Sequence, residues 1–441
     1  MKFKGGIHPQ YNKGTAAAPV EEMPLGGRYV VPLAQHLGAP GKPIVAKGDV
    51  VGRGQPLSEP GGFVSVAVHA PTSGKVKAIK ELPHPLGLDM TAVEIEPDGE
   101  DAWWEGVQPK GDWRGMDPAD IRDALREAGL VGMGGATFPT HVKLSPPKDK
   151  PIDTFILNGA ECEPYLTSDH RVMLEQPREV MEGVGLFMKV LGVKKAHVGV
   201  EANKADALEA LKAACPPDLD VDFALLEVKY PQGSEKQLIY ALTGRTVPAG
   251  GLPMDVGCLV QNVGTAVAAY EAVAKGWPLI QRVTTVTGAA ISQPKNLRLR
   301  VGTPLGDVIA FCGGLTEDVA KVVYGGPMMG IAQFSLDVPI IKGTSGVLCL
   351  PDAEVVQYVA DACIRCGACV DACPMGLLPS TLGVLCERDR WEDLEDYNVL
   401  DCIECGSCAF CCPAYRPLVQ LIKRGKAELR RIQKKRQQGA A

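Results

Sequence analysis

Cysteines are the residues of this chain with the clearest potential for chemistry. Ten of the fifteen fall within residues 363–412, and the odd total excludes a fully paired set of disulfides. Two runs share the spacing Cys-x2-Cys-x2-Cys-x3-Cys-Pro, with which thiolates ligate [4Fe–4S] clusters. The first run is Cys363, Cys366, Cys369 and Cys373, and the second is Cys402, Cys405, Cys408 and Cys412. The spacing therefore predicts two iron–sulfur clusters.

Each cluster draws on both runs, because the fourth cysteine of a run ligates the other cluster in proteins that hold two. We predict one cluster on Cys363, Cys366, Cys369 and Cys412, and the other on Cys402, Cys405, Cys408 and Cys373. Gly367 and Gly406 would let the backbone approach each cluster closely. Zinc is the alternative, but four thiolates at this spacing would crowd one tetrahedral ion. The other cysteines, including Cys411, lack the spacing, and we expect most of them to be core residues.

The composition is that of a globular protein with several domains. A chain of 441 residues, 46% hydrophobic and 22% charged, has room for about two to four domains. The N-terminus lacks the apolar stretch of a secretory signal, and no apolar window is long enough to span a membrane, so we expect neither feature. So many thiols favour a reducing compartment. With a net charge of −6, we expect no nucleic-acid partner.

The C-terminal tail, residues 423–441, is basic: it carries eight Lys or Arg and one acidic residue, Glu428. A solvated terminal helix explains such a tail, and so does a contact with anionic lipid or an acidic partner. In the second case, neutralising Lys434, Lys435 and Arg436 should weaken attachment.

The elements that must position the cysteines change in type along the chain. Residues 1–100 form short β-segments between Gly and Pro turns, with alternating patterns at Phe63–Val68 and Lys75–Ile79. Residues 115–275 alternate strands with helices, which predicts a largely parallel sheet covered on both faces. Residues 283–345 are β-rich again, and residues 346–422 contain the cysteine runs. We therefore expect an α/β multidomain protein.

The pattern locates individual elements within these regions. In the central region we expect strands at Asp153–Asn158, Ala196–Glu201 and Val221–Lys229, and helices at Asp120–Gly129, Pro177–Leu191, Lys204–Ala214 and from Gln237 to Thr243. In the later β-rich region we expect strands at Val283–Thr287, Leu297–Val301 and Val322–Gly326, and a short helix at Thr303–Cys312. Ligands of parallel sheets bind beyond the carboxyl ends of the strands, so the segments that follow these strands are candidate sites.

Two of the smaller modules resemble known ones. The segment Gly48–Leu57 and the segment His69–Val76 together resemble the flattened barrel-sandwich domain of biotinyl and lipoyl carriers. Ser58–Ala67, between them, contains no lysine for cofactor attachment, so the resemblance implies a structural module. His69 is either a metal ligand or a turn or core histidine, and we favour the second. Residues 283–345 resemble the soluble-ligand-binding β-grasp (SLBB) domain, for which docking is favoured over ligand binding.

Four segments in the central region resemble the flavin-bearing subunit of respiratory complex I. They are Gly132–Lys143, which is glycine-rich, Asn158–Pro164, Tyr230–Glu235 and Val260–Thr265, in the order of that family. The resemblance implies a Rossmann-like α/β domain that binds FMN and NADH. Three residues depart from the family pattern: Met133 replaces an Arg, Ala160 an Asp, and Gln261 the first of two Asn.

The resemblance implies a role for each matched residue. The glycines would let the backbone approach the flavin and its phosphate, Lys143 would add positive charge, and Phe138 would stack on an aromatic ring. Asn158 and Asn262 would bond the ring or the ribityl chain. The glutamates would bind the ribose hydroxyls of NADH and resist a 2′-phosphate. The full predicted set is Gly132, Gly134, Gly135, Phe138, Lys143, Asn158, Glu161, Glu163, Gly233, Glu235, Asn262 and Thr265. No catalytic acid or base is expected, because the cofactors supply the chemistry.

Motifs along nearly the whole chain resemble the C subunit of the Rnf ion-translocating electron transport complex. They are Gly5–Pro9, Gln35–Pro40, His69–Gly74, Glu161–Tyr165, Thr167–His170, Gly325–Gly330 and the two cysteine runs. This family implies a peripheral subunit on the cytoplasmic side of the bacterial inner membrane. There it would pass electrons between NADH, FMN and two [4Fe–4S] clusters, with partners among the membrane and peripheral subunits and with ferredoxin or another iron–sulfur subunit.

Two other functions fit the same residues. A cobalamin reductase of the propanediol-utilisation type shares this architecture. A non-enzymatic electron-relay and docking subunit with a degenerate flavin site is the other alternative, which Met133 and Ala160 motivate.

Overall fold

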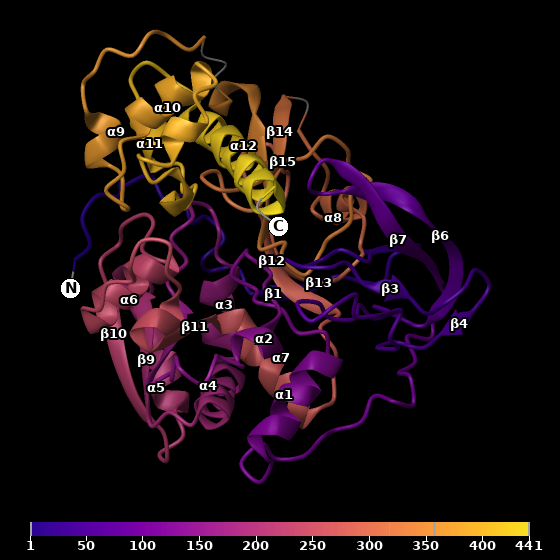
Figure 1. Ribbon diagram of the computed structural model, residues 1–441. Coiled ribbons are helices and arrows are strands. Elements are labelled where there is room, and N and C mark those ends of the chain that lie inside the picture. The colour runs from indigo at the N-terminus through magenta and orange to yellow at the C-terminus, as the bar shows by residue number, and fades with distance from the viewer. Residues whose placement is uncertain (1, 317, 356–358, 440–441) are drawn as a thin grey trace.

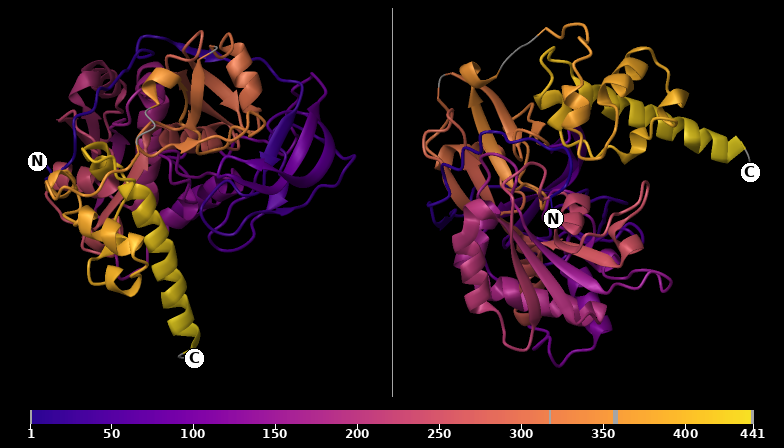
Figure 2. Two further views of the ribbon diagram at one scale, coloured as in Figure 1. Left: turned by 90° about the horizontal axis from the view of Figure 1, so that it is seen from above. Right: turned by 90° about the vertical axis from the view of Figure 1, so that its left-hand side faces the viewer.

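The computed structural model describes residues 2–316, 318–355 and 359–439, and it contains four modules and a long terminal helix (Figures 1 and 2). We predict the domain ranges 1–100, 115–275, 283–345, 346–422 and 423–441, of which residues 1, 317, 356–358 and 440–441 lie outside the described part. The cysteine-bearing module lies against the α/β module and the β-grasp module, and the barrel lies on the far side of the latter (Figure 1).

The central module is built on a parallel sheet in the order β10-β9-β8-β11. The strands are β8 (Thr154–Gly159), β9 (Lys195–Glu201), β10 (Asp220–Leu226) and β11 (Cys258–Asn262). The helices are α1 (Pro118–Glu127), α2 (Thr140–Lys143), α3 (Ser168–Glu175), α4 (Pro177–Leu191), α5 (Ala205–Ala214), α6 (Glu235–Thr243) and α7 (Val263–Ala274). The predicted elements of this region therefore form, with small shifts at their ends.

Apolar side chains on both faces of this sheet explain why the helices cover it. Leu157 and Phe155 of β8 pack with α1, α4 and α7 on one face, while Ile156 packs with α6 on the other. Helices α4 and α7 cross closely at Gly183, where a Cβ atom would lie 2.1 Å from the Ala266 carbonyl oxygen. Because a side chain at this position would separate the helices, the glycine sets their spacing.

The barrel module has a sheet in the order β2-β7-β6-β4 and a separate pair, β3 with β5. These strands are β2 (Tyr29–Pro32), β3 (Lys42–Pro43), β4 (Val50–Val51), β5 (Ser58–Glu59), β6 (Gly74–His84) and β7 (Leu88–Pro97). The prediction at Lys75–Ile79 is correct, since it falls in β6. The predicted strand at Phe63–Val68 is wrong. Side chains bond its backbone amides in place of a neighbouring strand: Val66 N–H donates to His36 Nε2 and Val68 N–H to Ser58 Oγ.

The β-grasp module has six strands in the order β1-β13-β12-β16-β14-β15. They are β1 (Val20–Glu22), β12 (Gln281–Thr287), β13 (Lys295–Arg300), β14 (Val319–Tyr324), β15 (Ile331–Ala332) and β16 (Gly346–Pro351), and the sheet is accompanied by α8 (Leu305–Phe311). The edge strand β1 comes from the N-terminal segment and pairs in parallel with β13. The first 22 residues thus tie modules together before the chain enters the barrel.

The cysteine module contains two similar halves. Each half has a cysteine loop, a short helix and a longer helix: α9 (Ala368–Asp371) with α10 (Pro379–Glu387), then α11 (Ser407–Phe410) with α12 (Leu418–Gly439). Gly367 and Gly406 occupy the same place in the two loops, and both have φ of 82°, which a side chain would strain. Short 3₁₀ turns lie at Ala202–Lys204, Pro253–Val256, Asp352–Glu354, Glu392–Leu394 and Val399–Asp401.

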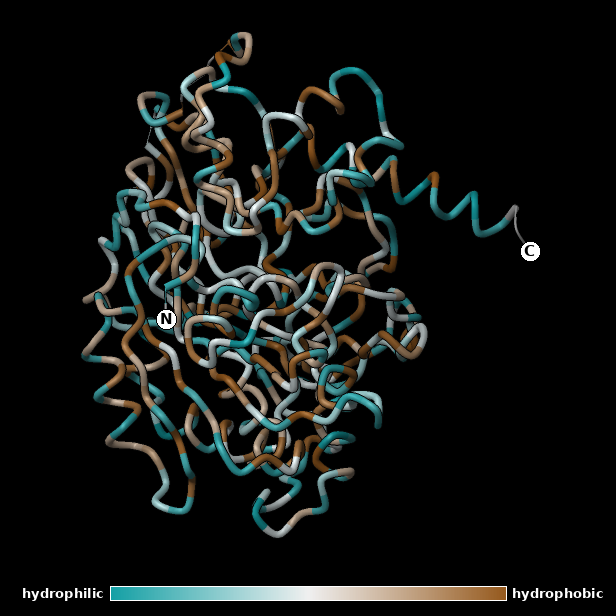
Figure 3. Tube along the Cα trace, turned by 60° about the vertical axis from the view of Figure 1, so that its left-hand side comes forward, coloured by the Kyte–Doolittle hydropathy of each residue, from teal (hydrophilic) through white to brown (hydrophobic). Residues whose placement is uncertain are grey.

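The basic tail forms the end of α12. Leu418, Ile422 and Leu429 are buried against the rest of the module, but the end of the helix projects from the body (Figure 2) and is mostly hydrophilic (Figure 3). Arg436 forms ion pairs with Glu392 and Glu395.

His69 is a buried histidine at the junction of three modules, as favoured from the sequence. Lys342, also buried, donates hydrogen bonds to the carbonyl oxygens of Ala67 in the barrel and Gly129 after α1. Burial and the Lys342 cation lower the pKa of His69 to about 3.

This histidine predicts a pH dependence of stability. Its pKa is lowered in the folded state, so the unfolded chain takes up a proton below about pH 6.5 while the folded chain does not. Stability should therefore fall as the pH drops from about 6.5 toward 3, by up to about 1.4 kcal/mol per pH unit. Anaerobic urea unfolding at pH 7 and 5.5 should show a smaller loss for His69→Gln than for the natural protein. Equal losses would contradict the prediction.

Candidate functional site

The candidate site lies where the order in which strands are added to the parallel sheet changes direction. The chain builds outward from β8 to β9 and β10, and then returns to add β11 on the other side of β8. Helices α4 and α7 cover one face of the sheet, and α6, which leads back to β11, covers the other. Folds of this class bind ligands in a crevice beyond the carboxyl ends of the strands where the strand order changes direction, and we call this region beside β8 and β11 the crevice. Asn158 at the end of β8 pairs in register with Asn262 at the end of β11. Two predicted ligands thus meet at the point where this fold class binds nucleotides.

The glycine-rich loop lies against the end of β11. The loop is closed by a hydrogen bond from Gly132 N–H to the Phe138 carbonyl oxygen, at 2.9 Å. It is tied to the start of α7 by Met133 N–H, which donates to Thr265 Oγ1 at 2.9 Å. A Cβ atom on Gly134 would lie 3.4 Å from the Asn262 side chain, whereas one on Gly135 would meet nothing within 4 Å. The tip of the loop therefore has open space in front of it, as a backbone cradle for a ligand requires.

Predicted residues from other elements complete the rim. Asn158 Nδ2 donates to the Gly233 carbonyl oxygen at 2.8 Å, so the turn before α6 is fixed to the end of β8. Lys143 of α2 forms an ion pair with Glu235, the first residue of α6. The predicted lysine and one of the predicted glutamates thus hold each other across the crevice.

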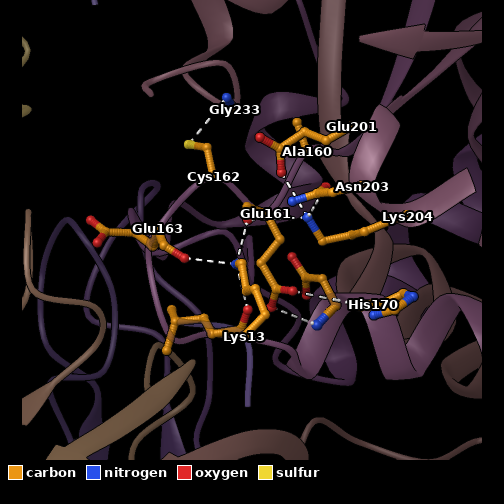
Figure 4. A network of polar contacts seen from close by, with 12 residues as sticks. Lys13, Ala160, Glu161, Cys162, Glu163, His170, Glu201, Asn203, Lys204 and Gly233 are labelled. Carbon is orange, nitrogen blue, oxygen red and sulfur yellow. Dashed lines mark hydrogen bonds and ion pairs between the residues drawn. The ribbon is translucent and has the colours of Figure 1, made fainter. Parts of the chain in front are cut away.

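The carboxyl groups of the other two predicted glutamates accept hydrogen bonds from backbone amides, and Figure 4 shows the polar network around Glu161 and Lys13. Glu161 Oε1 accepts a hydrogen bond from Asp169 N–H at 2.9 Å, so its carboxyl group caps the start of α3. Glu163 accepts from the amides of Met328 and Met329. Between them, half-buried Lys13 donates to the carbonyl oxygens of Glu161, Glu163 and Leu166 at 2.8, 2.8 and 2.6 Å. This segment is therefore a rigid wall of the site.

Two carboxyl groups at the site have raised pKa values. Burial raises the pKa of Glu163 to about 7, against the lowering effect of the Met328 and Met329 amides. Burial and the nearby Glu161 carboxylate raise the pKa of Asp169 to about 7. Asp169 accepts a 2.6 Å hydrogen bond from Asn262 Nδ2 and so orients that predicted ligand.

The sequence motifs gave no role to several residues that the structure places at the site. Asp169 was not among the predicted ligands, because its motif suggested no role. Gln232 and Gln261 are buried, and within the described residues the side-chain nitrogen of each has no hydrogen-bond partner. Unpaired buried amides beside the crevice fit a polar ligand that accepts hydrogen bonds. Together with the open glycine loop, they fit a bound flavin.

The cysteines line two small cavities, each in the crossed combination. One is lined by Cys373 and by Cys402, Cys405 and Cys408, with apolar side chains that include Leu382 and Ile422. The other is lined by Cys412 and by Cys363, Cys366 and Cys369. We name them the proximal cavity and the distal cavity, respectively, for their position relative to the α/β module. Each cavity thus has the four thiols predicted for one cluster.

The arrangement of the thiols favours clusters over single ions. In the part of the chain that the structure describes, no three His, Cys, Asp or Glu side chains converge closely enough to hold one metal ion. A cubane carries its iron atoms at separate corners, so its four thiolates stand farther apart than those around tetrahedral zinc. Four cysteines around a cavity fit the first arrangement.

The proximal cavity is the one in contact with the α/β module. The Tyr230 hydroxyl donates to the Cys405 carbonyl oxygen at 2.7 Å, and Gln237 Nε2 donates to the Pro374 carbonyl oxygen at 3.2 Å. In the distal cavity, Cys366 is exposed to solvent and Ile364 is 68% exposed. The two cavities therefore differ in burial: one lies toward the crevice and the other opens outward.

Comparison with family models supports the architecture. The Nuo51 FMN-binding domain matches residues 125–271, and the RnfC barrel sandwich hybrid domain matches residues 1–100. An SLBB domain matches residues 283–332 and a 4Fe-4S binding domain matches residues 356–378. The predicted fold class and order of modules are thus confirmed, and so are FMN and iron–sulfur clusters as the cofactors of these domains. Among the described residues, no helix is long and apolar enough to cross a membrane.

A solved structure shares the fold. A chain of an NAD+-reducing [NiFe]-hydrogenase in the H2-reduced state aligns with a TM-score of 0.52 and 22% identity, over 74% of this chain and 66% of that chain.

Relatives with similar sequences match almost from end to end. The chain is 52% identical to the C subunit of the proton-translocating ferredoxin:NAD(+) oxidoreductase complex of Clostridium ljungdahlii, over 97% of this chain and 94% of the relative. It is 49% identical to the C subunit of the Na(+)-translocating complex of Acetobacterium woodii, over 97% of each. It is 42% identical to the C subunit of the ion-translocating oxidoreductase complex of Rhodobacter capsulatus, over 99% of this chain and 85% of the relative. The chain therefore belongs to the family of C subunits of ion-translocating ferredoxin:NAD+ oxidoreductase complexes, the Rnf family that its motifs resemble.

Proposed function

We propose that this protein passes electrons between NADH and the iron–sulfur partners of a membrane-bound ion-translocating complex, through FMN and two [4Fe–4S] clusters. The observation that supports the proposal is that the candidate flavin site and the contacts to the proximal cysteine loops belong to one module. The crevice with the glycine loop, Asn158 and Asn262 lies in the same module whose Tyr230 and Gln237 contact the proximal cysteine loops. Bound FMN would accept a hydride from NADH and release electrons singly to the clusters. The protein contributes position and electrostatics.

Residues of the glycine loop and the strand ends hold the flavin in this proposal. The backbone of Gly132, Gly134 and Gly135 forms the cradle, and Phe138 borders it. Asn158, Asn262 and Thr265 fix the loop and the strand ends, and Asn262 is oriented by Asp169. Lys143, Gly233 and Glu235 lie across the crevice and are the candidate nucleotide contacts. Glu161 shapes the site through the backbone of α3.

The two clusters act in a fixed order in this proposal. Cys373, Cys402, Cys405 and Cys408 would hold the cluster that exchanges electrons with the flavin, because their loops contact the α/β module. Cys363, Cys366, Cys369 and Cys412 would hold the cluster that exchanges electrons with ferredoxin or another iron–sulfur subunit, because Cys366 is exposed.

Anaerobic reconstitution with iron, sulfide and FMN, followed by titration with NADH, tests the proposal. We expect NADH to bleach the flavin absorbance and then the cluster absorbance. A protein that binds FMN but is not bleached by NADH would refute the dehydrogenase function. A cluster-loaded protein that retains no FMN and has no affinity for NADH would favour the electron-relay alternative. The relatives belong to ion-translocating complexes, which supports this function over that of a cobalamin reductase.

The proposed location is the cytoplasmic side of the cell membrane, as a peripheral subunit, and the end of α12 predicts a contribution to attachment. Lys434 and Lys435 are exposed, and Arg436 is half exposed despite its ion pairs. Replacing all three with Gln should weaken co-sedimentation with vesicles of anionic lipid at low salt by about a hundredfold, at about 1 kcal/mol per basic residue lost near the surface. Neutral vesicles are the control. Unchanged binding at low salt would show that the tail is only a solvated helix.

A further inference from the structure

Glu163 has an unusual set of partners for a residue that its motif assigns to a nucleotide. Its carboxyl group accepts hydrogen bonds from the Met328 amide at 3.1 Å and the Met329 amide at 2.9 Å. A Cβ atom on Gly326 would lie 2.2 Å from Glu163 Oε2, so the loop of residues 325–330 closes tightly over the carboxyl group. A ribose would have to compete with both amides for these oxygens.

The loop of residues 325–330 extends from Glu163 to the proximal cavity. A Cβ atom on Gly406 would lie 2.9 Å from the Met328 carbonyl oxygen, so the cysteine loop and this loop are in close contact. The Met328 side chain packs in an apolar cluster that includes Cys162, Tyr230 and Cys405. The loop of residues 325–330 in the β-grasp module thus lies between Glu163 and Cys405, a predicted cluster ligand.

A second connection runs through Tyr230. Its buried hydroxyl donates to the Cys405 carbonyl oxygen at 2.7 Å and lies near enough to the Glu163 carboxyl group to lower the pKa of that group. Tyr230 is held from the other side by Ile7, with which it exchanges backbone hydrogen bonds of 2.8 and 2.9 Å. Gly6 N–H in turn donates to the Ala372 carbonyl oxygen, next to Cys373. The loop of residues 325–330 and Tyr230 thus both lead from Glu163 to the predicted ligands of the proximal cluster.

The other end of the segment that carries Glu163 is fixed at the flavin site. Lys13 bonds the carbonyl oxygens of Glu161 and Glu163, and Glu161 caps α3, which bears Asp169. A displacement of Glu163 would therefore change the distance between the crevice and the proximal cluster. Electron tunnelling slows steeply as that distance grows.

From these contacts, and resting on the function proposed above, we propose that Glu163 is a positioning residue. It fixes the proximal cluster loops against the flavin site through the loop of residues 325–330 and through Tyr230. It serves electron transfer between flavin and cluster, and it is not a ligand of NADH.

The test is Glu163→Gln in the full chain, reconstituted anaerobically with iron, sulfide and FMN. The amide can accept only one of the two backbone hydrogen bonds while keeping the size of the side chain. We expect unchanged FMN content, NADH Kd and rate of flavin bleaching by NADH, but cluster bleaching slower by roughly tenfold to a hundredfold. Hydrogen exchange at the Met328 and Met329 amides, measured without NADH, should become faster.

Tyrosine variants provide a second test and its control. Tyr230→Phe removes the hydroxyl that reaches Cys405 and should slow the same phase of cluster bleaching. Tyr165→Phe removes a hydroxyl that bonds Glu354 at the surface, and it should leave both phases unchanged.

Three outcomes would decide against the proposal. An NADH Kd raised by about tenfold in Glu163→Gln, with an unchanged cluster phase, would make Glu163 a nucleotide ligand after all. Unchanged hydrogen exchange at residues 328 and 329, or an unchanged cluster phase in both variants, would remove its positioning role. If NADH fails to bleach the flavin of the natural protein, the proposed function fails instead, and the exchange measurement still decides whether Glu163 holds the loop.

Discussion

Replacing Cys405 by serine should remove the proximal cluster and prevent NADH from reducing the distal one. Cys405 lines the proximal cavity, and its carbonyl oxygen is bonded by Tyr230 of the α/β module. Loss of one cluster leaves about half of the iron in the protein. If electrons pass through the proximal cluster, the distal cluster then has no route to the flavin. Iron analysis and EPR spectra of samples reduced with NADH, compared with samples reduced with dithionite, measure both effects.

Replacing Cys366 by serine should have the opposite pattern. Cys366 lines the distal cavity and is exposed. Its loss should halve the iron as well, but NADH should still reduce the remaining cluster. If NADH reduces the remaining cluster in Cys405→Ser but not in Cys366→Ser, the proposed order of the clusters is reversed.

The crossed ligand sets give this experiment internal controls. Cys373→Ser should abolish the same EPR signal as Cys405→Ser, although the two residues belong to different runs. Cys412→Ser should match Cys366→Ser. Cys411→Ser should keep both signals, because Cys411 lines neither cavity. Loss of a cluster in Cys411→Ser but not in Cys412→Ser would show that the motif was aligned one residue out of place.

The sequence was most informative where local spacing determines the structure. A cysteine run folds as one loop, so its spacing predicts the geometry around a cluster, and the two cavities have the predicted sets of thiols. Helix α4 has the predicted bounds because Pro177 suits its first turn and Gly192 its left-handed end. At Phe63–Val68 the alternating pattern failed, because backbone N–H groups of this segment donate to the side chains of His36 and Ser58 and not to a neighbouring strand. No local pattern could contain these contacts.

The same limit applies within the candidate site. The sequence placed Asn158 correctly at a strand end, but it did not predict β11, the strand that ends at Asn262 and pairs with β8. Motifs could not show that Glu163 bonds the loop at Met328, because that contact joins residues 165 positions apart. The N-terminal segment was assigned to the barrel region, but Lys13 packs at the flavin site instead. Residues that link modules are therefore the ones that local sequence patterns miss.

The glycine loop provides the second large effect, which is the loss of FMN in Gly135→Val. Gly135 has φ of 106°, and a Cβ atom there meets no protein atom within 4 Å. A Cβ atom is therefore free of protein contacts there, but a valine would strain the backbone and occupy the open space in front of the loop. We expect FMN affinity to fall by about a hundredfold, which corresponds to about 3 kcal/mol. Flavin content after reconstitution and fluorescence titration with FMN measure the loss.

Gly111→Val is the matched control for backbone strain. Gly111 has φ of 123°, and a Cβ atom there also meets nothing within 4 Å. It lies near the end of α7 at Val273, which accepts a hydrogen bond from Lys110 N–H, whereas the glycine loop contacts the start of that helix. Both variants should lose a similar, small amount of stability, about 1–2 kcal/mol. Only Gly135→Val should lose FMN while keeping both clusters. Loss of FMN in both variants would show that backbone strain alone causes the loss, since the strain is similar at the two positions. Retention of FMN in both would show that the glycine loop does not bind the flavin.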